Sequence, residues 1–288
     1  HDLRSSEREV CGRFSEDNGV TWSPPRTLFS LGDQPEGLEA VNVALVDEQG
    51  EVHAFFLRIW KPGDGQEGEA EEAIRFRSRG RRIDIWHART ENDRQSWQAP
   101  RCIWQGFTGA LNSVIQLRSG RILLPFSYAT PRKWRNRGEG LEAFTFMGDF
   151  RSVVIYSDDG GANWTLSDDV RTVVPDITYA QGAIEPVVFE LKDGRVWMSI
   201  RTQMGRLYET FSADGASWST PMPSRFISSC SPAGIVRLDD GRIVLCWNSC
   251  LRYPYGYGGR QVIHAAISND EGKTWRGYRE VLRDPLRN

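Results

Sequence analysis

The stretch that decides the fold is the turn at residues 268–275, which reads SNDEGKTW and follows the apolar run VIHAAI. Its Ser and Asp side chains can bond the backbone amides of the same turn, and its Gly permits a positive φ. The closing Trp is large enough to plug the gap between strands. The stretch therefore predicts a hairpin turn that satisfies its own polar groups and ends in a hydrophobic stopper.

The same turn recurs along the chain. Four further copies close on a tryptophan, namely SEDNGVTW at 15–22, TENDRQSW at 90–97, SDDGGANW at 157–164 and SADGASW at 212–218. A second repeated feature is a tight hairpin on Gly, which reads DEQGEV at 47–52, RSGRIL at 118–123, KDGRVW at 192–197 and DDGRIV at 239–244. Each Gly hairpin joins two strand-like runs, and helical periodicity is absent throughout. The two repeats together predict units of four antiparallel strands.

These units place the chain in the all-β class. Four of them are expected, at about 41–104, 111–174, 184–227 and 233–282, while residues 1–30 supply only a third and a fourth strand. Such spacing is typical of a β-propeller with four-stranded blades. Because a propeller hides its sheet edges by closing a ring, we expect a single propeller domain over 1–288 that is incomplete at both ends. The long connections 61–80 and 130–149 can shape a substrate cleft or form solvated loops.

Composition argues against several classes of partner. The 288 residues carry 36 Lys and Arg against 38 Asp and Glu, a formal charge of −2, which gives no field to attract nucleic acid or a membrane surface. No apolar run is long enough to span a membrane. The four histidines lack metal-ligand spacing, so we expect neither a metal nor a cofactor. The cysteines predict mostly buried thiols, with a disulfide between some pair as the alternative; they are Cys11, Cys102, Cys230, Cys246 and Cys250.

With five Ser/Asp/Trp turns on four-stranded units, the sequence resembles the sialidase (neuraminidase) superfamily, in its bacterial branch with BNR or Asp-box repeats. The resemblance covers nearly the whole chain and implies a six-bladed β-propeller. It also implies a chemistry in which an arginine triad clamps the substrate carboxylate, a Glu polarises a Tyr nucleophile, and an Asp acts as acid/base. Similar boxes occur in polysaccharide lyases and in propellers without enzymatic activity, so the boxes indicate a fold more firmly than an activity.

The best match to the family's site is IEPVVFELKDGRVWMSIR at 184–201. The resemblance implies that Glu185 is the family's catalytic Glu and that Arg201 is its second triad arginine. The Gly194 hairpin brings the ends of both strands to one rim, where a carboxylate can meet a guanidinium. An ordinary structural Arg–Glu pair across a hairpin is the alternative.

Arg260 resembles the third arginine of the triad, because it lies at the start of a third strand ahead of the box serine Ser268. A planar fork of N–H donors suits a carboxylate, and a pair of forks fixes its orientation. Arg252 and Arg206 are lesser candidates for the same clamp. For Arg260 the alternative is a solvated loop arginine beside the Gly-rich run YPYGYGG.

The other members of the family's site match less well. Asp2 and Glu7, in HDLRSSERE ahead of the first box, are the candidates for the catalytic acid/base, and a surface ion pair with nearby arginines is the alternative. The first triad arginine is expected before residue 1, and the Tyr nucleophile in a blade beyond residue 288. The three tyrosines of YPYGYGG precede Arg260, so they are expected to stack on sugar or line a loop.

The residues and the resemblance together favour a glycoside hydrolase similar to exo-sialidases, with an acidic glycan or sialoside as substrate. Two alternatives stay open. One is a lyase or hydrolase on uronic-acid glycans, and the other is a non-catalytic carbohydrate-binding propeller in which Trp60, Trp86, Trp104 and Trp134 stack on sugars. No nucleic-acid partner is expected, and the resemblance implies a secreted or periplasmic protein.

Overall fold

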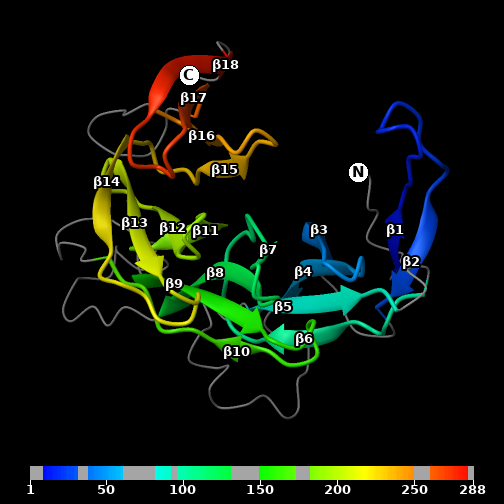
Figure 1. The fold of residues 1–288 in the computed structure, drawn as a ribbon. Helices are drawn as coiled ribbons and strands as arrows, with labels where there is room; N and C mark the ends of the chain where they lie inside the picture. Colours follow the sequence, from blue (N-terminus) through cyan, green and yellow to red (C-terminus); the bar gives the residue numbers. More distant parts are fainter. Residues whose placement is uncertain are drawn as a thin grey trace. The chain divides into compact units, whose positions relative to one another are not determined.

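The computed structural model describes residues 9–31, 38–60, 82–91, 96–130, 149–172, 182–249 and 260–284. Regular structure in these residues consists of β-strands, which confirms the predicted all-β class (Figure 1). No helix that could cross a membrane occurs among the described residues. The chain divides into two compact units, His1–Ala110 and Leu111–Asn288.

The first unit contains a two-stranded and a four-stranded antiparallel sheet. The two-stranded sheet pairs β1 (Glu9–Gly12) with β2 (Arg26–Ser30). The four-stranded sheet has the order β3 (Leu38–Val46), β4 (Val52–Trp60), β5 (Arg82–Arg89) and β6 (Arg101–Trp104). Its core includes Val10 of β1, Phe29 of β2 and Phe56 of β4, which pack in one cluster.

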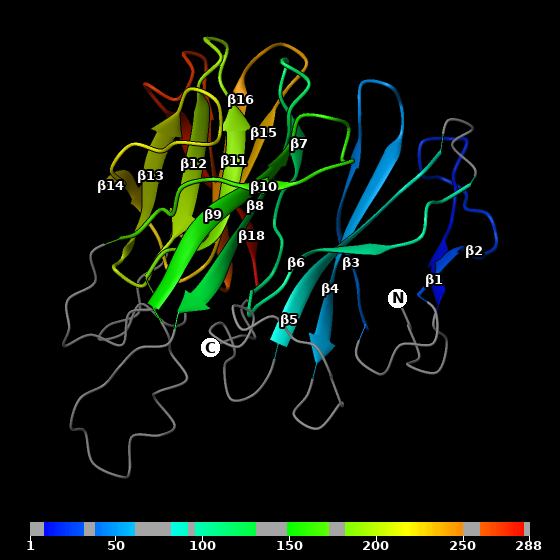
Figure 2. The ribbon, with the colours of Figure 1, turned by 90° about the horizontal axis from the view of Figure 1, so that it is seen from below.

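The second unit contains three four-stranded antiparallel sheets (Figure 2). The first sheet is made of β7 (Ile115–Gln116), β8 (Ile122–Thr130), β9 (Asp149–Ser157) and β10 (Thr165–Leu166). The second is made of β11 (Ile184–Glu190), β12 (Val196–Arg201), β13 (Arg206–Ser212) and β14 (Met222–Ile227). The third is made of β15 (Gly234–Arg237), β16 (Ile243–Trp247), β17 (Val262–Ser268) and β18 (Arg276–Arg283). β11 contacts β8 and β9 on one side and β15 on the other, so the second sheet lies between its neighbours.

Each sheet is a meander in which consecutive strands pair, and the predicted four-strand unit is therefore confirmed within the described residues. Gly194 has φ +89°, a conformation that costs glycine little, and it closes the β11–β12 hairpin at the predicted place. The strand β12 is buried at every position, whereas β14 alternates between buried and exposed residues. The strand β12 lies inside the sheet, whereas β14 is the edge strand farther from β11 in the strand order. Closure of a six-bladed ring and a single domain over 1–288 stay predictions.

The turn at 268–275 bonds its own backbone as the sequence predicts. Ser268 Oγ accepts from the amides of Asp270 and Gly272 at 3.3 and 2.8 Å, and Asp270 Oδ1 accepts from the amide of Thr274 at 2.8 Å. Equivalent bonds occur in the turns that begin at 15 and 157. Bonds from the side chain and amide of Thr274 lower the pKa of Asp270 to about 2.

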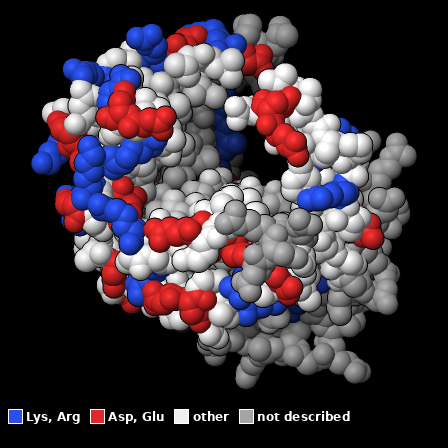
Figure 3. Space-filling model, turned by 45° about the vertical axis from the view of Figure 1, so that its right-hand side comes forward, with Lys and Arg blue, Asp and Glu red and all other residues white. Residues whose placement is uncertain are grey.

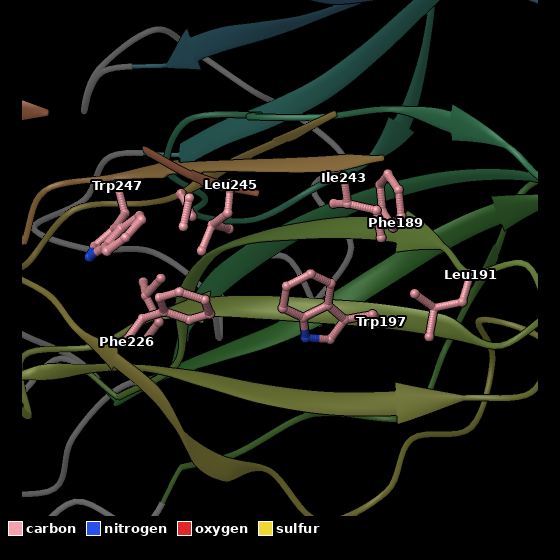
Figure 4. Close-up of a cluster of buried hydrophobic side chains, with 10 residues drawn as sticks. Phe189, Leu191, Trp197, Phe226, Ile243, Leu245 and Trp247 are labelled. Atoms are coloured by element: carbon pink, nitrogen blue, oxygen red, sulfur yellow. The ribbon is translucent and has the colours of Figure 1, made fainter. Parts of the chain in front are cut away.

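Two of the closing tryptophans, Trp97 and Trp275, pack between neighbouring sheets, whereas Trp22 is 58% exposed. Trp275 follows β17 of the third sheet, yet its ring lies 6.2 Å from that of Trp197 and 5.2 Å from that of Phe226, both in the second sheet. Trp97 likewise lies 5.0 Å from Phe29 of β2. In both cases the ring contacts the sheet that precedes its turn in the chain. A hydrophobic cluster between the second and third sheets continues this packing through Phe226, Trp247 and Leu245 (Figure 4).

The cysteines differ in part from the expectation of buried thiols. Cys11, Cys102, Cys230 and Cys246 are free, and of these Cys230 is buried while Cys11 is exposed. Cys11 follows the buried Val10 on β1, and neighbouring residues of a strand face opposite sides, so its exposure follows from the alternation. Cys250 lies outside the described residues.

Candidate functional site

A bulge at the start of β11 aims Glu185 away from the ladder. The register between β11 and β12 shifts between Ile184 and Val187, and Glu185 has φ +47°, which residues with a side chain rarely adopt. Its amide donates to Ser127 Oγ of β8 at 3.1 Å, which holds the unusual backbone in place. Backbone strain of this kind gathers at functional sites. Glu185 is therefore the one described residue of the predicted site that carries such strain.

Arg201 lies at the end of β12, opposite Glu185. Its Nη1 is 2.6 Å from Glu185 Oε2, and the two side chains are 9% and 20% exposed. Its Nε and Nη2 donate to Cys230 Sγ at 3.2 and 3.1 Å. Burial acts to lower the pKa of Arg201, but the contacts with Glu185 and Cys230 outweigh it, so the pKa is raised. Arg201 is thus a fixed positive charge at the edge of solvent.

Arg260 comes from the connection that leads into β17 and meets the same cysteine. Its Nη2 donates to the carbonyl oxygen of Cys230 at 2.6 Å, while the residue as a whole is exposed. Asn248 Nδ2 donates to the carbonyl oxygens of Arg260 and Val262 at 3.3 and 2.8 Å and so fixes this stretch of backbone. Glu185, Arg201, Cys230 and Arg260 are together called the arginine cluster below.

The arginine cluster has the charge and the donors to hold an anion. The cluster contains two guanidinium groups and one carboxylate, which pairs with Arg201, and this leaves an excess of positive charge. Each terminal guanidinium nitrogen carries a pair of hydrogens, so Arg201 and Arg260 retain donors beyond the bonds described. Arginine forks bind carboxylates through paired, charge-assisted hydrogen bonds. The arrangement can therefore bind and orient a carboxylate.

The other predicted site residues do not join the arginine cluster in the part of the chain described. Arg206 begins β13, and its Nη1 donates to the carbonyl oxygens of Ser224 and Arg225 at 3.2 and 3.3 Å. Its guanidinium therefore supports the edge strand β14, and a role in the clamp stays a prediction. Arg252, Asp2 and Glu7 lie outside the described residues.

Sequence reasoning missed Cys230, Ser127 and Asn248, which hold the predicted site residues. It also missed Tyr128, whose hydroxyl donates to Asp169 at 2.7 Å, with Arg151 Nη1 on the same carboxylate at 2.7 Å. Burial and then Asp169 raise the pKa of Tyr128 to about 12. The phenol therefore stays protonated at neutral pH. None of these residues has a local sequence signature, although the run SSCSP ahead of β15 is unusual enough to have drawn attention.

Among the described residues, no group of three or more His, Cys, Asp or Glu side chains could hold a metal ion. In the first unit, His53 lies 3.0 Å from His87 and 3.1 Å from Asp47. Burial lowers the pKa of both histidines, that of His87 to about 2. This pair is therefore neutral and buried.

On the face drawn in Figure 3, acidic and basic side chains are interspersed.

Comparisons with known proteins point to one fold. The model of the BNR repeat-like domain family matches residues 39–285. The Hadza microbial sialidase Hz136 is 19% identical with a TM-score of 0.67, over 96% of this chain and 53% of the sialidase. A Dyadobacter fermentans protein of unknown function is 19% identical with a TM-score of 0.63, over 96% of this chain and 72% of the other.

A Trypanosoma rangeli sialidase, solved in complex with the inhibitor DANA, is 13% identical with a TM-score of 0.57, over 96% of this chain and 44% of the sialidase. No curated protein matches the sequence significantly. The chain spans about half the length of the sialidase structures it resembles. At such identities the likeness shows a common fold, and what the relatives bind is a property of those proteins.

Proposed function

The chain belongs to the BNR repeat-like family and has a sialidase-like fold, and from this premise we propose that it is a glycoside hydrolase acting on a terminal acidic sugar. In this proposal Arg201 and Arg260 hold the sugar's carboxylate, and Glu185 is the catalytic carboxylate beside them. The four-stranded sheets are blades of a six-bladed propeller. The substrate class comes from the sialidases that share the fold, and its chemistry agrees with the arginine cluster.

One observation carries the proposal: Arg201 and Arg260, distant in sequence, both bond Cys230. Two guanidinium groups held by one residue can donate hydrogen bonds to both oxygens of a single carboxylate. Such bonds orient the sugar ring as well as binding it. Glu185 pairs with only one of the two cations. The remaining charge favours an anionic ligand over a neutral one, and more strongly where water is partly excluded.

A second candidate function is carbohydrate binding without turnover. It is favoured by the ion pair of Glu185 with the guanidinium of Arg201 at 2.6 Å, because this pair holds the arginine for binding and needs no reaction step. Among the described residues, the tyrosine Tyr128 donates to the carboxylate of Asp169, and its pKa is raised. Asp2 and Glu7 are proposed as the acid/base by resemblance alone. The clamp would serve a binding protein equally well.

The test is hydrolysis of a fluorogenic sialoside by wild type, Arg260→Ala and Arg195→Ala. Arg195 is the control because it lies on the β11–β12 hairpin with a half-exposed side chain, which pairs with Asp193 at 2.8 Å and lies over the ring of Phe211, both outside the arginine cluster. We expect Arg260→Ala to lose at least about tenfold in kcat/KM, since one charge-assisted fork is worth about 1.5–3 kcal/mol, while Arg195→Ala stays at wild-type level.

The outcomes separate the alternatives. Equal loss in both variants, or no loss in Arg260→Ala, would contradict the clamp. Binding of the sialoside without release of the fluorophore would establish the non-catalytic function. Ultraviolet absorbance of an unsaturated uronate, released from a uronic-acid glycan, would replace the hydrolase by a lyase.

A further inference from the structure

The connection between β14 and β15 is the element that reaches both arginines of the arginine cluster. Ser228, Ser229, Cys230 and Ser231 lie in it and are 1–3% exposed. Ser228 N–H donates to the carbonyl oxygen of Gly205, in the loop that follows Arg201, at 3.1 Å. The amide of Ser229 donates at 3.0 Å to the carbonyl oxygen of Asn248, whose side chain holds the Arg260 backbone. The connection is thus tied to both segments that carry an arginine.

From this arrangement we propose that Cys230 is the positioning residue of the carboxylate clamp, with its Sγ orienting Arg201 and its carbonyl oxygen orienting Arg260. The effect that this inference expects on ligand affinity rests on the proposed function. The orientation of the two arginines by Cys230 rests only on the hydrogen bonds between them. Nε and Nη2 of Arg201 both donate to the Cys230 sulfur, at 3.2 and 3.1 Å. The carbonyl oxygen of Cys230 accepts from Arg260 Nη2 at 2.6 Å.

A thiol at this place has a physical advantage over a carboxylate. Sulfur is a weak acceptor, so it can fix the direction of the guanidinium without competing strongly for it. An Asp or Glu in the same position would form a second ion pair with Arg201, which already pairs with Glu185. That second pair would cancel the positive charge that a carboxylate ligand needs. Cys230 therefore sets geometry while leaving charge available.

The inference predicts different effects from three substitutions. Cys230→Ala removes the acceptor for Arg201 but keeps the backbone carbonyl for Arg260, so affinity for a sialoside is expected to fall about tenfold. Cys230→Ser keeps an acceptor and is expected to stay within about threefold of wild type. Cys246→Ala is the matched control, because Cys246 is a free, partly buried thiol of β16 in the same unit.

The experiment combines a measurement without ligand and one with ligand. Nitrogen-15 spectra of the arginine Nε–H groups report the Arg201 bond directly, and we expect its resonance to be protected from exchange in wild type, Cys230→Ser and Cys246→Ala and to lose that protection in Cys230→Ala. Calorimetry with an α-sialoside then gives the affinities. A merely structural cysteine would change the unfolding temperature while leaving the Arg201 resonance unaltered in the folded protein.

Three results are decisive. Loss of Arg201 protection together with weaker binding in Cys230→Ala supports the inference. An unchanged Arg201 resonance in Cys230→Ala overturns it, whatever happens to binding. If wild type binds no sialoside but the Arg201 resonance still depends on Cys230, the positioning role holds and the proposed function fails.

Discussion

The packing between the second and third sheets of the larger unit predicts a large loss of stability for Phe226→Ala. Phe226 is 3% exposed, and its ring meets Trp247 at 4.9 Å and Trp275 at 5.2 Å, edge-on in both cases. Burial of a phenylalanine contributes about 2–3 kcal/mol, and two aromatic pairs add about 1–2 kcal/mol. The sum of about 4 kcal/mol lies within the range of about 3–5 kcal/mol for such substitutions in cores.

Ile227 provides the control for this prediction. It is the next residue of β14, is 44% exposed, and its carbonyl oxygen accepts from Trp247 Nε1 at 3.0 Å whatever the side chain. We expect Ile227→Ala to lower the free energy of unfolding by no more than about 1 kcal/mol.

The assay is thermal unfolding followed by tryptophan fluorescence and near-ultraviolet circular dichroism, because Trp197, Trp247 and Trp275 share the cluster with Phe226. For a unit of this size each kcal/mol shifts Tm by about 2–4 °C, so Phe226→Ala should lower Tm by about 8–16 °C. A shift below about 3 °C, or equal shifts for both variants, would refute the packing described for these sheets.

Three further predictions concern pH and backbone conformation. The pKa of Asp270 is lowered to about 2 in the folded protein. The stabilising effect of its carboxylate is therefore present above the ordinary pKa and is lost as pH falls through about 2. Asp270→Asn should make the decline of Tm between about pH 4 and pH 2 less steep. Burial lowers the pKa of His87 to about 2, so below pH 6.5 the unfolded chain binds a proton that the folded chain does not. The free energy of unfolding should therefore fall by up to about 1.4 kcal/mol per pH unit below pH 6.5. His87→Gln should reduce this dependence on pH, as measured by urea titrations. Gly194→Ala should cost about 1 kcal/mol in the same titrations because φ is +89° with no neighbour within 4 Å, whereas Gly234→Ala, whose φ is not positive, should be nearly neutral.

The turns and hairpins could be predicted from the sequence because their causes are local. Ser268, Asp270 and Gly272 satisfy one another within a few residues, and Gly194 supplies a conformation that its own hairpin needs. The meander of each sheet follows, since consecutive strands joined by such turns pair with each other. The contact of Trp275 with the preceding sheet had no such local cause, because it depends on Trp197 and Phe226 across the gap.

The site could be predicted only in part, for a similar reason. Glu185 lies near the start of the first strand of the hairpin and Arg201 at the end of the second, so the Gly194 turn alone brings them to the same open end. Arg260 reaches them through Cys230, in a connection that belongs to neither strand of the hairpin. A lone thiol in a buried connection carries no sequence pattern, and neither does the bulge that gives Glu185 its positive φ.

Carboxylate recognition by the arginine cluster is tested most directly by calorimetry with an α-methyl sialoside and with its methyl ester. The two ligands differ only at the carboxyl group, which is an anion in the acid and a neutral methyl ester in the other, so a clamp built from Arg201 and Arg260 should bind the acid at least about tenfold more tightly. Arg260→Ala should remove most of that difference. Equal affinity of wild type for the acid and the ester would contradict the account.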